Sequence, residues 1–192
     1  MLTVSTLNQS YGGSHTLWDI ELQVPLGSRT CLMGRNGMGK TTLLKCIMGL
    51  VPASSGKIVF EGRDLRTRPA EERAGLGIGY VPQGTNTFPQ LTVHENLQLG
   101  AWVFRRDAAR VTQMLERAYA AFPRLGEKRS LRATGLSGGE AKMLSIAKEM
   151  VTDPRLLLID EPSAGLSPKI TEQVYSQLLA ARVWGLTILL VD

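Results

Sequence analysis

A glycine-rich segment, Gly34-Arg-Asn-Gly-Met-Gly-Lys-Thr41, constrains the fold of this 192-residue chain more than any other feature. It fits the pattern G-x-x-x-x-G-K-[ST], which marks a phosphate-binding loop when a strand precedes it and a helix follows it. Both flanks are present, because residues 30–33 form an apolar run and residues 40–48 have a helical pattern that stops at Gly49. We therefore expect a strand, a phosphate-binding loop and a helix in succession.

The chemistry of this loop follows from its residue types. Glycines allow main-chain amides to turn inward around a polyphosphate, and the N-terminus of the following helix adds its positive dipole. We expect Lys40 to neutralise the β- and γ-phosphates of a nucleotide, and Thr41 to hold Mg²⁺ through its hydroxyl group. The alternative is a glycine-rich turn without a ligand, and the Lys-Thr pair at the right offset argues against it. The expected nucleotide-binding residues of the loop are Gly34, Arg35, Asn36, Gly37, Met38, Gly39, Lys40, Thr41 and Thr42.

Two carboxylates, Asp160 and Glu161, follow an apolar run that is typical of a buried strand. Ligands of parallel α/β sheets bind at the carboxyl ends of strands, so we expect Asp160 to reach the Mg²⁺ and Glu161 to polarise an attacking water. Gln83 follows another expected strand, and its amide can contact both metal and water. The alternatives are a helix cap or plain solvation for the two acids, and a plain loop-tip role for the glutamine. The predicted catalytic residues are Glu161, Gln83 and Lys40, and the predicted metal ligands are Thr41, Gln83 and Asp160.

The segment Leu136-Ser-Gly-Gly-Glu140 begins another expected helix. Ser137 and Glu140 have the spacing of a capping box, which explains the serine and the glutamate but not the two glycines between them. Bare glycine amides at a positive helix end form an anion site. Both interpretations stay open here: a second anion site would be useful if it covered the other side of a nucleotide held by a partner chain, and its candidate residues are Ser137, Gly138, Gly139 and Glu140.

The order of apolar patterns predicts an α/β fold in one domain. We expect a P-loop NTPase core with a parallel sheet, preceded by an N-terminal antiparallel β part at residues 2–24. Residues 84–151 are helical in pattern, with a helix expected from Thr92, which has the capping-box spacing to Glu95, and they are expected to form an inserted α-helical subdomain. Residues 1–83 and 152–192 then form the catalytic core, with further elements expected at residues 155–159 (strand), 167 to about 183 (helix) and 186–191 (strand).

Composition excludes several classes of protein. The chain has no apolar run long enough to span a membrane and no signal-peptide pattern, so we expect it in the cytoplasm. Its net charge of +5 arises between residues 105 and 132. We favour the solvated face of a surface helix there over a nucleic-acid site or a site for an anionic membrane surface, because stacking aromatics are not interleaved. Cys31 and Cys46 lack metal-ligand spacing and are expected as small buried residues.

Taken together, these motifs resemble an ABC-type ATP-binding cassette. The matching order is Tyr11, the loop at 34–42, Gln83, Leu136-Ser-Gly-Gly-Glu140, Asp160-Glu161 and Ser163-Ala-Gly-Leu-Ser167, which covers nearly the whole chain. The resemblance implies that Tyr11 stacks on adenine and that Gln83 couples the two lobes. It also implies that Ser137 and Gly139 contact the γ-phosphate of ATP held by the opposite subunit, and that residues 163–167 cross the dimer interface.

Longer stretches are similar to the ATP-binding subunits of branched-chain amino acid importers and of their urea- and amide-importing relatives. Among them are Gly77-Ile-Gly-Tyr-Val-Pro-Gln-Gly84, whose end is closer to the urea branch, and residues 88–97. This resemblance implies ATP and Mg²⁺ as cofactors, a second cassette in a head-to-tail dimer, transmembrane permease subunits and, indirectly, a solute-binding protein. It places the chain on the cytoplasmic face of the membrane. Residues 85–87 and the pair Ala141-Lys142, where the family usually has two glutamines, depart from the pattern.

The family's switch residue, usually a histidine, is expected just after residue 192, and neither His15 nor His94 is placed to replace it. We therefore expect a cassette that lacks its C-terminal end, binds nucleotide and hydrolyses it poorly. The alternatives are a soluble, non-transport ABC ATPase, a hydrolysis-deficient regulatory fragment, and a different phosphate-loop enzyme such as a small-molecule kinase. The Leu-Ser-Gly-Gly element argues against the kinase.

Overall fold

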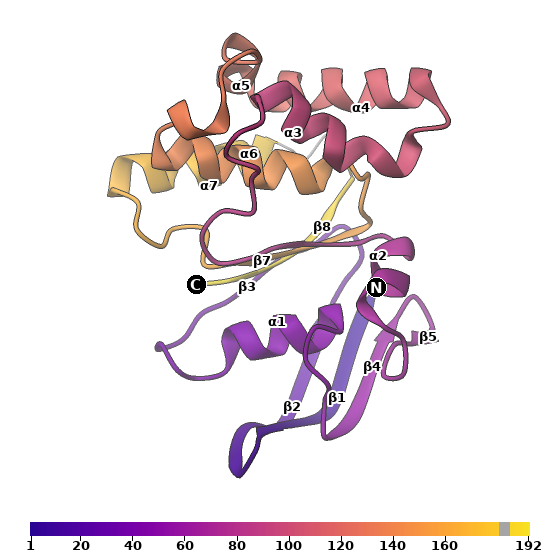
Figure 1. The fold of residues 1–192 in the computed structure, drawn as a ribbon. Coiled ribbons are helices and arrows are strands. Elements are labelled where there is room, and N and C mark those ends of the chain that lie inside the picture. The colour runs from indigo at the N-terminus through magenta and orange to yellow at the C-terminus, as the bar shows by residue number, and fades with distance from the viewer. Residues whose placement is uncertain (181–184) are drawn as a thin grey trace.

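A four-stranded parallel sheet forms the centre of the computed structural model, which describes residues 1–180 and 185–192 (Figure 1). Every residue of the two inner strands is buried. Parallel strands that are covered on both faces need continuous apolar runs, and for this reason the apolar runs in the sequence predicted strands at 155–159 and 186–191. The strand order is β3 (Arg29–Leu32), β8 (Thr187–Val191), β7 (Leu156–Asp160) and β6 (Ile78–Val81).

Below the parallel sheet in Figure 1 lies a second, antiparallel sheet, with helix α1 (Lys40–Met48) between the two. Helix α1 has the predicted bounds because Gly49 ends it in the left-handed conformation, at a φ of 84°. An apolar cluster fills the space around α1, and Leu156 and Leu158 of β7 project into it. The strand order of the second sheet is β2 (Ser14–Val24), β1 (Leu2–Tyr11), β4 (Ser55–Phe60) and β5 (Arg63–Asp64).

The helices that cover the opposite face of the parallel sheet lie above it in Figure 1. Leu157 and Ile159 of β7 project into the apolar cluster beneath these helices. Alternate residues of this strand are therefore buried in the two apolar clusters on opposite faces of the sheet. Thr92 and Ser137 begin α3 and α6 with the capping boxes that their sequence spacing predicts. These elements are α3 (Val93–Gly100), η1 (Ala101–Phe104), α4 (Ala108–Ala121), α5 (Pro123–Glu127), η2 (Ala133–Gly135), α6 (Gly138–Met150) and α7 (Pro168–Ala180), while the short α2 (Ala70–Gly75) precedes β6.

The α/β fold class is confirmed, with one difference in detail. Cys46 is buried as expected, but the prediction is wrong for Cys31, which is exposed. Cys31 lies on β3, and among the described residues this short strand pairs only with β8, so it stands at the edge of the sheet. Helix α7 begins at Pro168 as predicted, whereas its expected end near Val183 lies outside the described residues.

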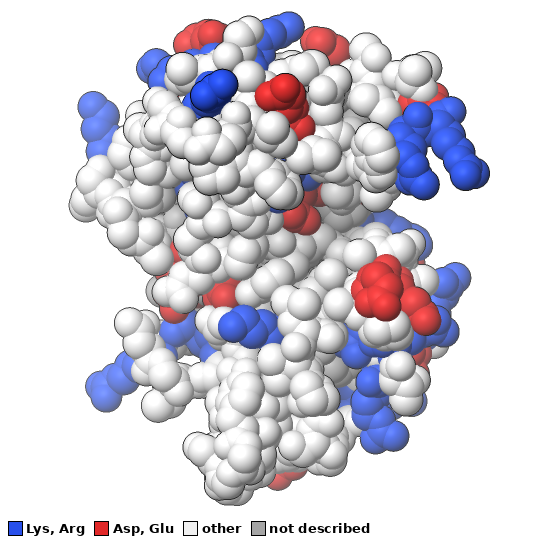
Figure 2. Space-filling view, viewed as in Figure 1, with Lys and Arg blue, Asp and Glu red and all other residues white. Residues whose placement is uncertain are grey.

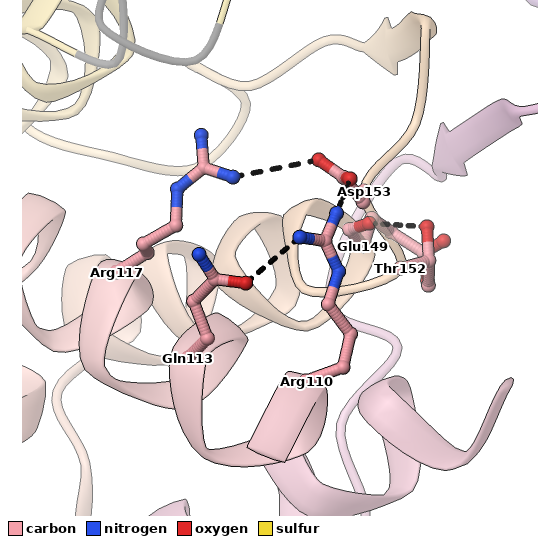
Figure 3. Close-up of polar contacts among 6 residues, drawn as sticks. All are labelled: Arg110, Gln113, Arg117, Glu149, Thr152 and Asp153. Atoms are coloured by element: carbon pink, nitrogen blue, oxygen red, sulfur yellow. Dashed lines mark hydrogen bonds and ion pairs between the residues drawn. The ribbon is translucent and has the colours of Figure 1, made fainter. Parts of the chain in front are cut away.

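Lys and Arg side chains project from the helical part of the molecule into solvent (Figure 2). Arg105 and Arg106 are exposed, as a solvated face requires. The half-buried bases instead form ion pairs: Arg110 and Arg117 of α4 both contact Asp153, which follows α6 (Figure 3). Part of the basic segment at residues 105–132 therefore links α4, through ion pairs, to the residue that follows α6. In the part of the chain that the structure describes, no helix has the length and hydrophobicity needed to cross a bilayer.

Candidate active site

The phosphate-binding loop lies between β3 and α1, as its sequence predicts. Gly37 and Gly39 both have a φ of 82°, a conformation that other residues adopt only with strain. At Gly39 there is also no room for a side chain, because a Cβ atom would lie 2.7 Å from Leu17 Cδ2 and 3.1 Å from the carbonyl oxygen of Thr16. Strand β2 thus approaches the loop closely and requires glycine at this position.

Lys40 is the loop's cation, and only 7% of it is exposed. Its ammonium group donates hydrogen bonds to the carbonyl oxygens of Gly34, at 2.5 Å, and Arg35, at 3.1 Å. The side chain is therefore folded back along the loop rather than extended into solvent. Because charge-assisted bonds to phosphate are stronger than bonds to neutral carbonyls, a polyphosphate entering the loop would compete well for this ammonium.

Thr41 and Asp160 meet although they are 119 positions apart in the sequence: the Thr41 hydroxyl donates to Asp160 Oδ1 at 2.9 Å. Tyr80 donates to the other carboxylate oxygen at 3.1 Å, and Asp160 is fully buried. Burial and the adjacent Asp160 carboxylate raise the pKa of the Tyr80 hydroxyl, which keeps it protonated as a donor. A buried carboxylate beside a hydroxyl group is a donor set that fits Mg²⁺, a cation that prefers oxygen ligands.

Glu161 and Gln83 form the second polar pair of the site. The Gln83 amide nitrogen donates to Glu161 Oε2 at 2.7 Å, across a sequence separation of 78 residues. Glu161 has a φ of 41°, which is unfavourable for a residue with a side chain, and its main-chain amide donates to the Val191 carbonyl at 2.9 Å. Its carboxylate is thus placed by a strained turn directly after β7, where strain accompanies function in many proteins.

A cavity of about 340 Å³ brings together eight of the predicted site residues, from the phosphate-binding loop, Gln83 and Glu161. Thr16 also lines it and was missed by sequence reasoning, because nothing in its own sequence context marks β2 as a neighbour of the loop. The predicted residues Tyr11, Gly34, Arg35, Met38 and Asp160 do not line the cavity, and Tyr11 is 48% exposed near the β1–β2 turn. The lining residues are Thr16, Asn36, Gly37, Gly39, Lys40, Thr41, Thr42, Gln83 and Glu161.

The Ser137–Glu140 segment lines a different cavity, also of about 340 Å³, on the helical side of the molecule. Ser137 caps α6, and Glu140 pairs with Lys128 at 2.6 Å. Burial acts to raise the pKa of the Glu140 carboxyl, but hydrogen bonds from Lys128 and Ser137 outweigh it and lower that pKa. Within one chain, this segment and the phosphate-binding loop therefore belong to separate surfaces.

Gly139 has a packing role that its motif does not reveal. A Cβ atom on Gly139 would lie 2.4 Å from Cγ2 of Ile170 on α7, so the two helices approach each other through this glycine. Gly138 has no such neighbour, since its nearest contact would be Leu166 Cδ2 at 3.8 Å. The two adjacent glycines thus meet different steric demands.

Gly139→Ala is expected to lower the free energy of unfolding by about 1–3 kcal/mol, because the added methyl group overpacks against a stiff β-branched side chain. Gly138→Ala is the matched control and should be neutral or slightly stabilising, since alanine favours helix. Urea denaturation of both variants, and of Gly139→Ala combined with Ile170→Ala, measures the difference. Equal stability of the two single variants would refute the contact, as would an equal loss in the Ile170→Ala background.

Comparisons with known proteins agree with this geometry. Residues 17–164 match the family model described as ABC transporter. A probable branched-chain amino acid transport ATP-binding protein, LivF of Archaeoglobus fulgidus, is 40% identical over 100% of this chain and 81% of its own length. The high-affinity branched-chain amino acid transport ATP-binding protein BraG of Pseudomonas aeruginosa is 38% identical over 100% of this chain and 82% of its length.

Other relatives are named for other cargo, and the solved structures agree on the fold. The lipopolysaccharide export system ATP-binding protein LptB of Haemophilus influenzae is 34% identical over 100% of this chain and 80% of its own length. The structure of cbiO1 from Clostridium perfringens, part of an ABC transporter complex, superposes with a TM-score of 0.89 at 28% identity, covering 100% of this chain and 77% of that one. The chain therefore belongs to the ABC transporter family and is one of its ATP-binding subunits, an ATPase.

Proposed function

We propose that the chain binds ATP with Mg²⁺ and hydrolyses it, poorly on its own as its sequence predicts, to power import of branched-chain amino acids, or of urea and amides, through a membrane permease. The observation that carries the catalytic part is the meeting of Thr41 with Asp160 and of Gln83 with Glu161 beside the phosphate-binding loop. The names of the relatives at 38–40% identity favour branched-chain amino acids as cargo. The Val81-Pro-Gln-Gly84 form supports the urea branch.

Each residue has a distinct task in this proposal. The loop amides and Lys40 bind and orient the phosphates, and Tyr11 stacks on adenine. Thr41, Asp160 and Gln83 would hold Mg²⁺, which supplies charge neutralisation at the β- and γ-phosphates. Glu161 orients the attacking water and takes its proton, while the Gln83 amide holds the Glu161 carboxylate in place. Catalysis then rests on positioning and on charges fixed before the reaction begins.

A second cassette completes the site in this proposal. Ser137, Gly139 and Glu140 line a cavity apart from the phosphate-binding loop. This separation supports the proposal that the segment from Ser137 to Glu140 contacts ATP held by the opposite subunit. Such an arrangement is a head-to-tail dimer in which residues 163–167 cross the interface. Residues 1–83 and 152–192 act as the catalytic core, and residues 84–151 act as the helical lobe that drives the permease at the cytoplasmic face of the membrane.

Transport measurements separate this function from its alternatives. Reconstituted with the permease and solute-binding protein of a branched-chain amino acid system, the chain is expected to support ATP-dependent accumulation of labelled leucine in vesicles. Accumulation of urea instead, with the corresponding urea permease, would assign the urea branch. Association with neither permease, together with ATP hydrolysis that permeases do not change, would overturn the transport role and favour a soluble ABC ATPase.

A further inference from the structure

A lysine at position 142 is buried in the middle of the molecule. Lys142 lies on α6, and only 4% of it is exposed. Its ammonium donates hydrogen bonds to the carbonyl oxygens of Pro82, at 3.1 Å, and Gly84, at 2.9 Å. An ammonium group taken out of water is costly unless it is hydrogen-bonded, so these two contacts are what stabilise Lys142 in its place.

The two carbonyls flank Gln83, which is itself tied to the catalytic carboxylate. Lys142 therefore holds the main chain immediately before and immediately after this residue, and leaves the Gln83 side chain free to donate to Glu161 at 2.7 Å. Burial lowers the pKa of the Lys142 ammonium, and the charges of Asp160 and Glu161 oppose that shift. The lysine thus also adds a positive charge close to the two acids of the site.

Further polar side chains of α6 fasten the residues that follow Gln83. Ser145 accepts from the main-chain amide of Asn86 at 3.2 Å, and Lys148 donates to the Asn86 carbonyl. Glu149 accepts from the Asn86 side-chain amide at 2.9 Å. Residues 82–86 are consequently attached to one helix at several points, and Lys142 is the attachment nearest to Gln83.

Helix α6 is in turn fixed to the rest of the helical part. Near its start, Glu140 forms an ion pair with Lys128. Just past its end, Asp153 forms ion pairs with Arg110 and Arg117 of α4 (Figure 3). The same helix begins at Ser137, five positions before Lys142 and about 7.5 Å from it along the helix axis. A displacement of α6 would therefore be passed to the main chain around Gln83.

We propose that Lys142 is a positioning residue that clamps the main chain on both sides of Gln83 to α6, so that the Gln83 amide meets the Glu161 carboxylate only when α6 is in its proper place. The inference deepens the proposed function and rests on it. It assigns a task to a residue that departs from the glutamine usual at this position of the family pattern. It also makes the first turns of α6 a direct link between Ser137 and the catalytic carboxylate.

The test uses Lys142→Met, which keeps the length of the side chain but removes its charge and its donors. Lys142→Arg retains both, and Lys57→Met removes an exposed lysine from β4 as the matched control. We expect Lys142→Met to lower kcat at least about tenfold while the Kd for ATP stays within about twofold, and Lys142→Arg to recover most of the loss. Hydrogen exchange at the amides of residues 83–86 should accelerate in Lys142→Met alone.

Several outcomes would overturn the clamp. Wild-type kcat and unchanged exchange at residues 83–86 in Lys142→Met would show that Lys142 does not position Gln83. A loss of ATP affinity equal to the loss of kcat, unrepaired by arginine, would assign Lys142 to general stability. If Lys142→Met fails to fold, Lys142→Gln, which retains an N–H donor, is compared in the same way.

Different measurements test the clamp and the proposed function, so one can be refuted without the other. Absence of ATP binding by the wild-type chain would contradict the proposed function. Exchange at residues 83–86 would then decide the clamp by itself, because it is measured without nucleotide. Faster exchange in Lys142→Met would support the clamp, and unchanged exchange would refute it.

Discussion

Glu161→Gln is expected to bind ATP as tightly as the wild-type chain and to lower kcat by about 10²–10⁴-fold, the usual contribution of a general base. The substitution keeps the shape of the side chain but removes its ability to accept a proton. Because Gln83 and the main chain around Glu161 stay in place, the binding cavity keeps its lining. Steady-state hydrolysis and equilibrium binding of labelled ATP measure the two quantities on one preparation.

The control for this prediction is Glu172→Gln. Glu172 lies on α7 and is exposed, and it is not among the residues that line the catalytic cavity. Its substitution removes the same charge without touching the site, so hydrolysis should remain at the wild-type rate. Wild-type turnover in Glu161→Gln would remove the glutamate from the catalytic machinery. An equal loss in both variants would show that net charge, rather than position, matters.

Lys40→Met is expected to weaken ATP binding by about 100-fold or more, which corresponds to about 2.7 kcal/mol. The ammonium is the buried cation of the loop, and it is held where the phosphates would enter. Its replacement removes charge-assisted hydrogen bonds that no other described side chain of the cavity can supply, because Lys40 is the only Lys or Arg among the described residues that line it. Calorimetric titration with ATP measures the change in Kd.

Lys45→Met tests whether this loss is specific. Lys45 lies on the same helix, five positions further on, and does not line the cavity. It should bind ATP with wild-type affinity. A thermal melt of both variants separates lost affinity from lost folding, and equal weakening in the two variants would contradict the assigned role of Lys40.

Local signals in the sequence account for much of the fold. Helix α1 was predicted with its observed bounds because a glycine on either side marks its ends, and capping boxes marked the starts of α3 and α6. Continuous apolar runs identified β7 and β8 as buried strands. These features depend on neighbours within a few residues, which is the range over which a single sequence is informative.

Features set by tertiary contact were beyond sequence reasoning. The exposure of Cys31 follows from the position of β3 at the sheet edge. The order of the strands cannot be inferred from the residues of any single strand. Tyr80 contacts Asp160 across 80 positions, and the Lys142 contacts to Pro82 and Gly84 span about 60. The approach of Ile170 to Gly139 is likewise a property of helix packing.

The candidate site likewise has one part that the sequence predicts and another that only the folded structure shows. Its residue types were predictable because phosphate binding and Mg²⁺ binding require particular side chains next to strand ends. The residues that hold those side chains in place, Tyr80 for Asp160 and Lys142 around Gln83, became visible only once the chain was folded.

The most direct test of this account is a titration of the wild-type chain with ATP in the presence of Mg²⁺, followed by calorimetry and compared with Lys40→Met under identical conditions. The account predicts saturable binding of one ATP per wild-type chain, a Kd about 100-fold weaker or more in Lys40→Met, and a weaker Kd for the wild-type chain when EDTA removes the metal. Equal affinity in both chains, or no saturable binding by the wild-type chain, would contradict it.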